Sequence, residues 1–188
     1  MRNVTDPRIT RTRLHVLETA RKMLSERRGE ALTFSSLSKE AQVSRRTLYV
    51  HWGTIEQVIS DAVTMPRTDD EAPSTSASPR ETLRTLLISM RDSLTEPVTS
   101  VAISTLVNHA AQNEKAAAAL QAMGDARTSQ FTALLGPIEP EQYSLLVGPI
   151  FFSEFLAREP ASDALIDILV ERGIEMLSLD DATAQRTA

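Results

Sequence analysis

The sequence predicts an all-α protein of about nine helices, and three observations lead to that class. Apolar residues recur at spacings of three and four along most of the chain, and no run of six residues alternates cleanly between apolar and polar. Prolines stand where helices begin or cannot continue, as at Glu96-Pro97 and Gly136-Pro137. With 188 residues, 41% of them hydrophobic, the chain is long enough to bury a core without disulfides.

The first four predicted helices begin at recognisable caps. The first follows Asp6-Pro7, in which an N-cap residue precedes a proline suited to the first helical turn. Thr33, Ser44 and Thr54 each offer a side-chain oxygen to the free N–H groups that open the next three helices. The predicted ranges are 7–28, 34–41, 44–53 and 54–65.

The remaining helices are longer and follow a polar connection. Residues 65–79, MPRTDDEAPSTSASP, replace apolar periodicity with proline, serine, threonine and acidic residues, which is typical of an exposed, flexible loop. Pro149 should bend the penultimate helix because it cannot donate a hydrogen bond to Leu145. The predicted ranges after the loop are 80–94, 97–111, 114–135, 140–158 and 162–179.

Charge is distributed unevenly along the chain. Residues 1–60 hold 11 Lys and Arg against 6 Asp and Glu, whereas residues 61–188 hold 9 against 19. A basic head joined to an acidic body suggests that the head binds a polyanion and that the body has another task. The net charge of -5 conceals this division.

The third predicted helix, from Ser44 onward, has an inward and an outward side. Leu48 and Trp52 are one turn apart and face a core, and the helix contains no acidic residue. Its opposite side combines arginine with hydroxyl groups and valine, which suits a DNA groove: arginine pairs with guanine, hydroxyls reach phosphates, and valine contacts a thymine methyl. The outward residues are Arg46, Thr47, Tyr49 and Val50.

A short helix, a turn and this basic helix together predict a helix-turn-helix. Phe34 to Ala41 would form the first helix, Gln42-Val43 the turn, and the helix after Ser44 would enter the major groove. The N–H groups at both helix starts favour phosphate. The alternative is that two short helices meet at a corner for packing alone.

The stretch VLETARKMLSERRGEALTFSSLSKEAQVSRRTLYVHWGTIEQVI resembles the DNA-binding domain of the tetracycline-repressor (TetR) family of transcriptional regulators. The resemblance rests on the first helix with its alanine, on Thr33, on Val43-Ser44 and on the stretch TLYVHW. In that stretch, His51-Trp52 stands where the family commonly has His-Phe. Three residues depart from the family pattern. Gln42 replaces the usual turn glycine, Ser38 replaces an alanine, and Ile55 replaces a lysine. Gln42 would have to adopt a left-handed backbone, at a cost of about 1 kcal/mol.

The resemblance also implies roles for individual residues. Thr33, Thr47, Tyr49 and His51 match positions that contact the DNA backbone, and Arg45 and Arg46 match positions that read bases. Trp52 matches a core aromatic. Ser35 and the capping Ser44 complete the phosphate contacts. The predicted DNA-binding set is Thr33, Ser35, Ser44, Arg45, Arg46, Thr47, Tyr49, Val50 and His51. Arg2, Arg8, Arg11 and Arg13 would either follow the DNA as an arm or only aid solubility.

The last two predicted helices are apolar on more than one side, which favours contact with a partner as well as with their own domain. The resemblance implies that they pair across a two-fold axis, and the alternative is a thick monomer core. The predicted interface residues are Tyr143, Val147, Ile150, Phe151, Glu154, Leu165, Ile168, Leu169 and Arg172.

The resemblance further implies a pocket for a small effector in the body. His109 and Arg127 are polar groups that can orient a ligand in an apolar cavity, although each candidate also suits an ordinary core. The candidates are Leu87, Met90, Arg91, Leu94, Leu106, His109, Met123, Arg127, Phe131, Phe152 and Phe155.

Enzymatic functions lack the required residues. The chain has no cysteine and three histidines without metal-binding spacing, so we expect neither a metal nor a cofactor. No nucleophile-elbow, dinucleotide-binding or P-loop motif occurs. The absence of cysteine, of a secretory signal and of an apolar run long enough to span a bilayer favours the cytoplasm and no membrane association.

The sequence therefore predicts a homodimeric one-component regulator, most simply a repressor that binds a palindromic operator on double-stranded DNA and is released by a small molecule. We expect a helix-turn-helix domain over residues 1–53, a connecting helix over 54–65, a flexible loop over 66–79, and an effector-binding and dimerisation domain over 80–188. Two alternatives remain. One is a DNA-binding dimer without an effector, and the other is a ligand-binding protein or enzyme with a vestigial helix-turn-helix.

Overall fold

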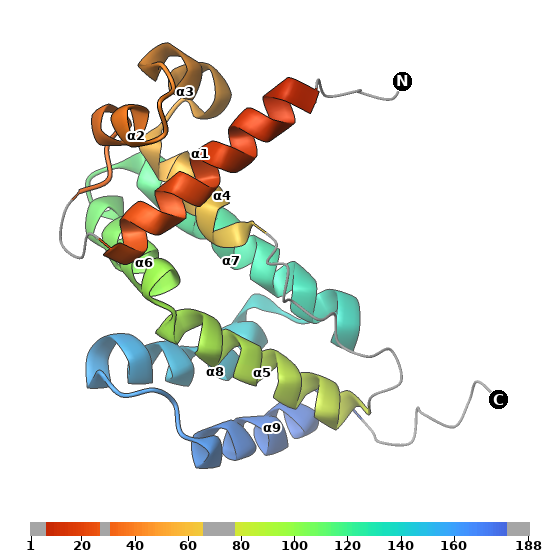
Figure 1. Cartoon of the computed structure of the whole chain (residues 1–188). Helices are drawn as coiled ribbons and strands as arrows, with labels where there is room; N and C mark the ends of the chain where they lie inside the picture. The colour runs from red at the N-terminus through yellow and green to blue at the C-terminus, as the bar shows by residue number, and fades with distance from the viewer. Residues whose placement is uncertain (1–6, 27–30, 66–77, 180–188) are drawn as a thin grey trace. The chain divides into compact units, whose positions relative to one another are not determined.

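The chain is helical throughout the part that the structure describes. The computed structural model describes residues 7–26, 31–65 and 78–179, with the side chains of Pro7 and Arg8 left out. Within these ranges it contains nine α-helices and one π-helical segment, and no strand (Figure 1). The predicted all-α class with about nine helices is confirmed. None of the described helices combines the length and the apolar character that crossing a membrane requires.

The helices begin and end close to the positions that their caps and prolines predict. Outside the stretch 27–30, which is not described, and apart from the helix predicted over 140–158, the predicted ranges agree with the observed bounds to within two residues. In chain order the elements are α1 (Pro7–Glu26), α2 (Phe34–Glu40), α3 (Arg45–Trp52), α4 (Ile55–Thr64), α5 (Pro79–Thr95), α6 (Pro97–Ala110), α7 (Glu114–Leu135), α8 (Pro140–Phe151), η1 (Phe152–Ala157) and α9 (Asp163–Leu177).

Hydroxyl caps account for most of these starts. Thr33, Ser44 and Thr54 each accept a hydrogen bond from a backbone N–H of the first turn that follows, as the sequence predicted. Ser78 caps α5 and Ser162 caps α9 in the same way. Residues 66–77 of the predicted flexible loop lie outside the described residues, and α5 already begins at Pro79.

The chain divides into two compact units. Unit 1 comprises residues 1–67 and 97–123, and unit 2 comprises residues 68–96 and 124–188. The helix α6 and the first part of α7 therefore belong to the same unit as the N-terminal helices, while the rest of α7 belongs to the unit of α5, α8 and α9. The functional boundaries at residues 53, 65 and 79 stay a prediction, because compactness alone assigns no function to either unit.

Unit 1 is built on α1, which packs against α4 and α6, while α4 also packs against α6. In Figure 1, α1 runs alongside α4, and α2 and α3 lie next to each other at one end of the unit. Leu37 of α2 and Leu48 of α3 are fully buried and join the two short helices to the core. Val16 of α1, Val58 of α4 and Ala102 of α6 are fully buried in the same core.

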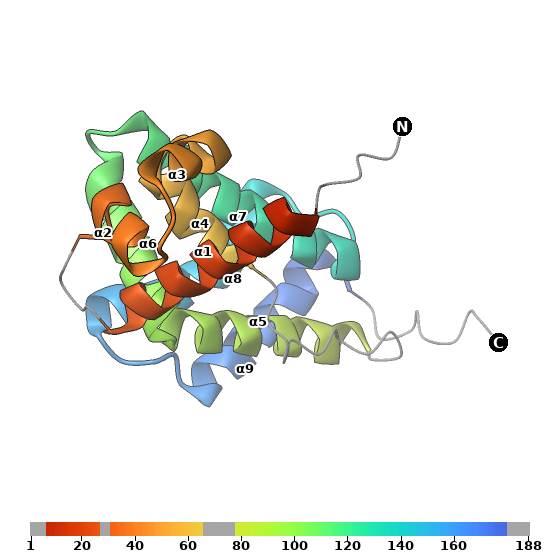
Figure 2. The same cartoon turned by 45° about the horizontal axis from the view of Figure 1, so that its top comes forward.

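Unit 2 is built on α5, which packs against α8 and α9 (Figure 2). Leu83, Leu146 and Ile166 form its buried centre. Gly173 of α9 lies close to two of them: a Cβ placed there would be 2.5 Å from Leu83 Cδ2 and 2.9 Å from Leu146 Cδ2. The missing side chain therefore lets α9 approach α5 and α8.

The helix α8 changes its geometry after Pro149. Pro149 has no N–H group to donate to Leu145, and the N–H of Phe152 donates to the carbonyls of both Gly148 and Pro149. The next six residues, Phe152–Ala157, are π-helical. The predicted α-helix over residues 140–158 is therefore wrong for its final part, because the loss of the proline hydrogen bond loosens the regular pattern.

Candidate nucleic-acid interface

The turn between α2 and α3 is held by backbone geometry and one side chain. Gln42 adopts a left-handed conformation with φ 53°, which confirms the prediction for this position. The Val43 N–H donates to Ser38 O at 3.2 Å, and Ser38 Oγ donates to Val43 O at 2.7 Å. An alanine at position 38 would lack the second bond. The Ser38 hydroxyl therefore helps to offset the cost of placing glutamine where glycine is favoured.

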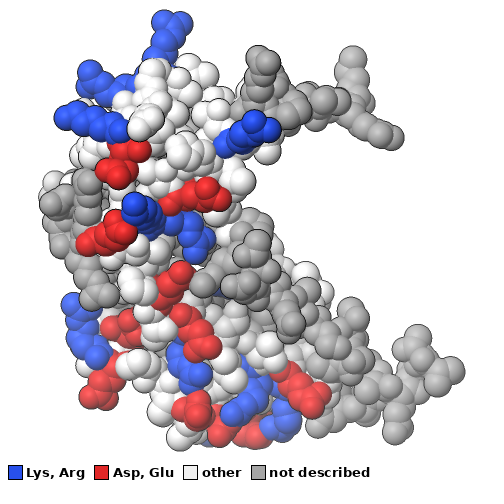
Figure 3. Space-filling view, in the orientation of Figure 1, with Lys and Arg blue, Asp and Glu red and all other residues white. Residues whose placement is uncertain are grey.

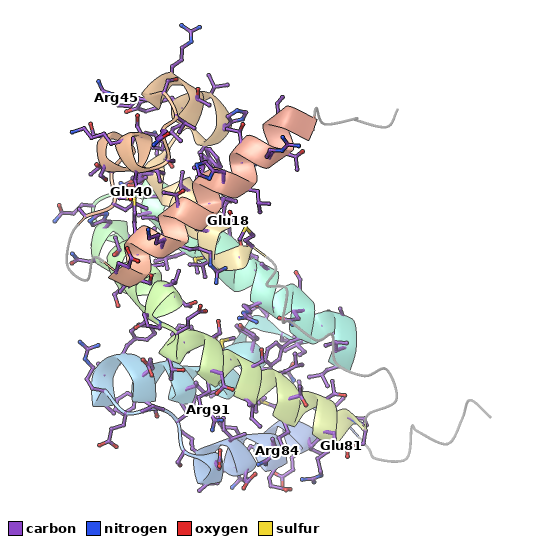
Figure 4. The ribbon with its side chains drawn as sticks, viewed as in Figure 1. Glu18, Glu40, Arg45, Glu81, Arg84 and Arg91 are labelled. Carbon is purple, nitrogen blue, oxygen red and sulfur yellow. The ribbon has the colours of Figure 1, made fainter. Side chains whose placement is uncertain are left out.

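The side chains of α3 have the two faces that the helical wheel predicts. Leu48 is 0% exposed and Trp52 is 7% exposed, whereas Tyr49 is 58% and Val50 is 72% exposed. Arg45 and Arg46 are also exposed, and Figure 4 shows Arg45 projecting away from the neighbouring helices. A tyrosine, a valine and two arginines thus share the outer surface of the helix.

Neighbouring side chains orient the rest of the predicted set. The Tyr49 ring meets the Phe34 ring edge to face, with 4.5 Å between the ring centroids, and the His51 ring meets Trp52 at 5.7 Å. Ser44 Oγ and Thr47 Oγ1 lie 2.8 Å apart at the start of α3.

At the start of α2, Thr33 Oγ1 and Ser36 Oγ lie 3.0 Å apart, and the side chain of Ser35 is exposed. Thr33, Ser44 and Thr47 therefore present hydroxyl groups beside helix N-termini, where phosphate is favoured. The structure brings the predicted polar residues together at the starts of α2 and α3.

Basic side chains gather over α2 and α3. Figure 3 shows lysine and arginine atoms at this end of unit 1, where Lys39, Arg45 and Arg46 are exposed. The sequence prediction missed Lys39, although its place in the last turn of α2 was readable from the chain. A DNA backbone at this surface would meet net positive charge.

The N-terminal arginines do not all have the same surroundings. Arg13 of α1 forms an ion pair with Asp61 of α4, with 2.9 Å between Nη2 and Oδ2, so it belongs to the framework of unit 1. Arg11 is exposed. Arg2 and the side chain of Arg8 lie outside the described residues. Among the described residues, Arg11 is therefore the one arginine of the four that is still available for the predicted arm along the DNA.

The predicted effector residues are divided between the two units. Leu106, His109 and Met123 belong to unit 1, where Leu106 is fully buried, Met123 packs against the core, and His109 is exposed. The others belong to unit 2: Leu87, Met90, Leu94 and Phe131 are buried, Phe155 is half-buried, Phe152 is exposed, and Arg91 and Arg127 are half-buried.

The two arginines among them have different partners. Arg91 is paired with carboxylates, since its Nη1 donates to Asp163 Oδ1 at 2.6 Å and its Nε to Asp92 Oδ1 at 3.0 Å. Arg127 donates to two neutral groups, Ser93 Oγ at 2.9 Å and Gln130 Oε1 at 3.0 Å. Among the described residues Arg127 therefore has no carboxylate partner, and its charge lies in a half-buried place.

Tyr143 lies near Arg127 and next to Phe131, with 5.4 Å between the ring centroids of Tyr143 and Phe131. Burial raises the pKa of Tyr143, and the Arg127 charge and a hydrogen bond with Thr128 oppose that shift. Thr128 also borders an open hollow of about 480 Å³ on one side of α7. The hollow is lined by Asp125, Thr128, Ser129, Thr132 and Ala133, none of which the sequence analysis selected.

The predicted interface residues separate into core and surface. Val147, Ile150 and Leu169 lie in the core of unit 2 and are at most 6% exposed. Ile168 is 58% exposed and Arg172 is exposed, while Tyr143, Phe151, Glu154 and Leu165 are half-buried. The structure also exposes three apolar side chains of α8 and η1 that were not in the predicted set: Leu145, Phe152 and Leu156.

A short helix, a left-handed turn and a capped basic helix with an outward face of this composition define a helix-turn-helix DNA-binding protein. Residues 16–62 match the family model of the bacterial regulatory proteins, tetR family. No curated protein matches the chain. Residues 16–62 thus form a DNA-binding domain of the tetR family of transcriptional regulators, and the resemblance predicted from the sequence is confirmed over this part of the chain. Regulators of this family are generally non-enzymatic.

Proposed function

We propose that the chain acts as a cytoplasmic homodimeric repressor that binds a palindromic operator through α3 and is released by a small molecule. The outer face of α3 carries this proposal, because it exposes Arg46, Tyr49 and Val50 together while Leu48 and Trp52 hold the helix to unit 1. An arginine, a tyrosine and a valine on one side of a short helix match what base edges and thymine methyl groups require.

Each residue of the interface has a proposed role. Arg46 donates to guanine O6 and N7, Val50 contacts a thymine methyl, and Tyr49 reaches a phosphate or a base edge. Thr47 and the N–H groups at the capped starts of α2 and α3 bind phosphates and set the register. Two copies related by two-fold symmetry would place their α3 helices about 34 to 36 Å apart, which calls for a near-palindromic operator.

Exposed apolar side chains in unit 2 support dimerisation. Leu145, Phe152 and Leu156 are 67%, 58% and 73% exposed, and their spacings of seven and four residues place them on one side of α8 and its continuation. Ile168 of α9 is 58% exposed. Large apolar side chains this exposed favour burial, and a second copy supplies the same side chains by symmetry.

An effector site in unit 2 is supported by Arg127 and Tyr143. The Arg127 guanidinium has neutral partners, and Tyr143 places a half-buried aromatic ring and a hydroxyl nearby. A small molecule with an acidic group and an apolar body suits such a site. A DNA-binding dimer without an effector is the second candidate function, and it is favoured by the ion pairs that already occupy Arg91.

The test of base reading is selection from a random pool of duplex DNA by the purified chain, followed by titrations of variants. Arg46→Ala should lose about 1 to 3 kcal/mol on the enriched duplex and relax the base preference at one position. Thr47→Ala should weaken binding to all sequences alike, because it removes a phosphate contact. Arg84→Ala is the control, because Arg84 of α5 pairs with Asp167 within unit 2 and belongs to neither the predicted DNA-binding set nor the predicted interface. No enriched sequence, or an equal loss on every duplex for Arg46→Ala, contradicts base reading by α3.

Dimerisation is tested by sedimentation of Ile168→Glu, which places a charge on the exposed apolar face and should give monomers. Val107→Glu is the control, because Val107 of α6 is 57% exposed but lies in unit 1. A dimer that persists in Ile168→Glu contradicts the proposed interface.

The effector site is tested with small acidic aromatic compounds. Compounds that release the enriched duplex from the wild-type chain but not from Arg127→Met would support the effector site, and release from both would contradict it.

A further inference from the structure

Asp61 of α4 joins three helices of unit 1 at one carboxylate. Its Oδ2 accepts hydrogen bonds from Arg13 Nη2 of α1 at 2.9 Å and from Trp52 Nε1 of α3 at 3.0 Å. Its Oδ1 accepts from Gln57 Nε2 of its own helix at 2.7 Å. The Arg13 guanidinium also stacks over the Trp52 ring, with 5.2 Å between its carbon and the ring centroid. Four side chains thus converge on a half-buried position.

These contacts restrain α3 more closely than apolar packing does. Leu48 is held by the core, but apolar contacts are non-directional and do not by themselves fix how a short helix is rotated. The indole N–H of Trp52 donates in one direction, and the guanidinium above the ring fixes its plane. Trp52 is the last residue of α3, and Gly53 with φ 71° ends the helix directly after it. The contacts therefore act at the end of α3 farthest from its capped start.

We propose that Asp61 is a positioning residue for DNA reading: it sets the orientation of α3 through the indole N–H of Trp52 and holds Arg13 away from the DNA. Asp61 lies on α4 and is not itself part of the outward face of α3. Its effect is on how well Arg46, Tyr49 and Val50 align with base edges, because bidentate contacts lose their strength when the helix is displaced. This inference rests on the proposed base reading by α3.

The proposal predicts an unusual pattern for Asp61→Asn. The variant should lose affinity for the enriched duplex, since the carboxylate no longer fixes Trp52 and Arg13. Its affinity for an unrelated duplex should be unchanged or higher, because Arg13 becomes available to phosphates and the net charge is more positive by one. We expect the ratio of the two affinities to fall on the order of tenfold, in keeping with the loss of a charge-assisted hydrogen bond.

The experiment uses the full chain and two duplexes: the one most enriched by the wild-type chain, and one of the same length and shuffled sequence, each titrated at several salt concentrations. Trp52→Phe is the second variant, because it keeps a core aromatic while removing the N–H donor together with one of the two fused rings. It should lower the affinity ratio in the same direction, and combining it with Asp61→Asn should add little further loss. Glu18→Gln is the charge-matched control, since Glu18 is an exposed carboxylate of α1.

Tryptophan fluorescence provides a second measurement, which needs no DNA. Trp52 is the sole tryptophan of the chain, so its emission and its quenching by acrylamide report on this contact directly. Asp61→Asn should change both, and Glu18→Gln should change neither. An unchanged affinity ratio in Asp61→Asn and Trp52→Phe, or an equal loss on both duplexes, overturns the proposal. If the wild-type chain enriches no duplex, base reading itself fails, whereas a sequence-selective wild type with unaffected variants sinks only the role of Asp61.

Discussion

The two units join their helices in different ways. Unit 1 uses polar contacts in half-buried or buried places: Asp61 meets Arg13 and Trp52, and Glu56, which is 8% exposed, accepts from Asn113 Nδ2 at 2.9 Å. Unit 2 uses arginine–carboxylate pairs along an exposed edge between α5 and α9. Figure 4 shows Arg84 and Arg91 on the side of α5 that faces α9. The pairs are Arg80–Glu171, Arg84–Asp167 and Arg91–Asp163.

The difference lies in what each kind of contact specifies. Exposed ion pairs contribute little because water screens them, so the stability of unit 2 comes from its apolar core. Half-buried hydrogen bonds are directional and costly to leave unpaired, so those of unit 1 determine how its helices are oriented. The helix α3 is thus held by directional hydrogen bonds, whereas the contact between α5 and α9 carries exposed ion pairs.

The largest effect should come from the core that holds α3. Leu48→Ala should destabilise unit 1 by about 2 to 5 kcal/mol, since Leu48 is 0% exposed and its removal leaves a cavity. Denaturant titration followed by Trp52 fluorescence measures this in unit 1, and circular dichroism follows both units. Val50→Ala is the control, and it should change stability by less than about 0.5 kcal/mol because Val50 is 72% exposed. If both probes shift together for Leu48→Ala, the two units unfold cooperatively.

A smaller effect should come from the close approach in unit 2. Gly173→Ala should destabilise by about 1 to 2 kcal/mol, because the new Cβ would press on the buried side chains of Leu83 and Leu146 and outweigh the gain in helix propensity. Gly124→Ala is the matched control, since a Cβ at this position of α7 meets nothing within 4 Å, and it should stabilise by up to about 1 kcal/mol. Thermal unfolding measures both. A stabilised Gly173→Ala would show that α9 can shift away from α5.

The smallest effect should come from the exposed pairs. The Arg91 and Arg80 guanidinium groups lower the pKa of Asp163 and Glu171, respectively. Because these pKa values are lower in the folded chain, the pairs stabilise unit 2 fully above the unfolded values of about 3.9 and 4.3. That contribution is lost as the pH falls through the lower folded values. Acid unfolding of the wild-type chain and of Arg80→Ala with Arg91→Ala should converge at low pH. A difference that does not shrink as the pH falls further below the unfolded values would contradict the assignment.

Local chemistry made the helix bounds and the faces of α3 predictable. Thr33, Ser44 and Thr54 carry the cap oxygen beside the N–H groups that need it, so neighbouring residues contain the whole signal. The left-handed turn at Gln42 followed from the resemblance, because the family usually has a glycine at this position. The outward position of Tyr49 and Val50 follows from the helical repeat once Leu48 is taken as buried.

Partners distant in the chain were not predictable in this way. Arg13 and Asp61 are 48 residues apart, and Arg127 and Ser93 are 34 apart, and no periodic pattern connects residues at such separations. Val147 and Leu169 were assigned to a partner surface, but in the structure they fill the core of unit 2. A helix that is apolar on several sides does not reveal which of them its own unit covers.

The sequence by itself determined the all-helical class, the caps, the basic helix-turn-helix and the family, because these depend on residues within a few turns of each other. Tertiary structure alone decided that Arg13 pairs with Asp61 and stacks on Trp52, and that Gly173 lets α9 approach α5 and α8. It also decided that Leu145 and Phe152 are exposed. These outcomes depend on how distant helices pack, and packing follows from the combined shape and volume of many side chains, which no local pattern encodes.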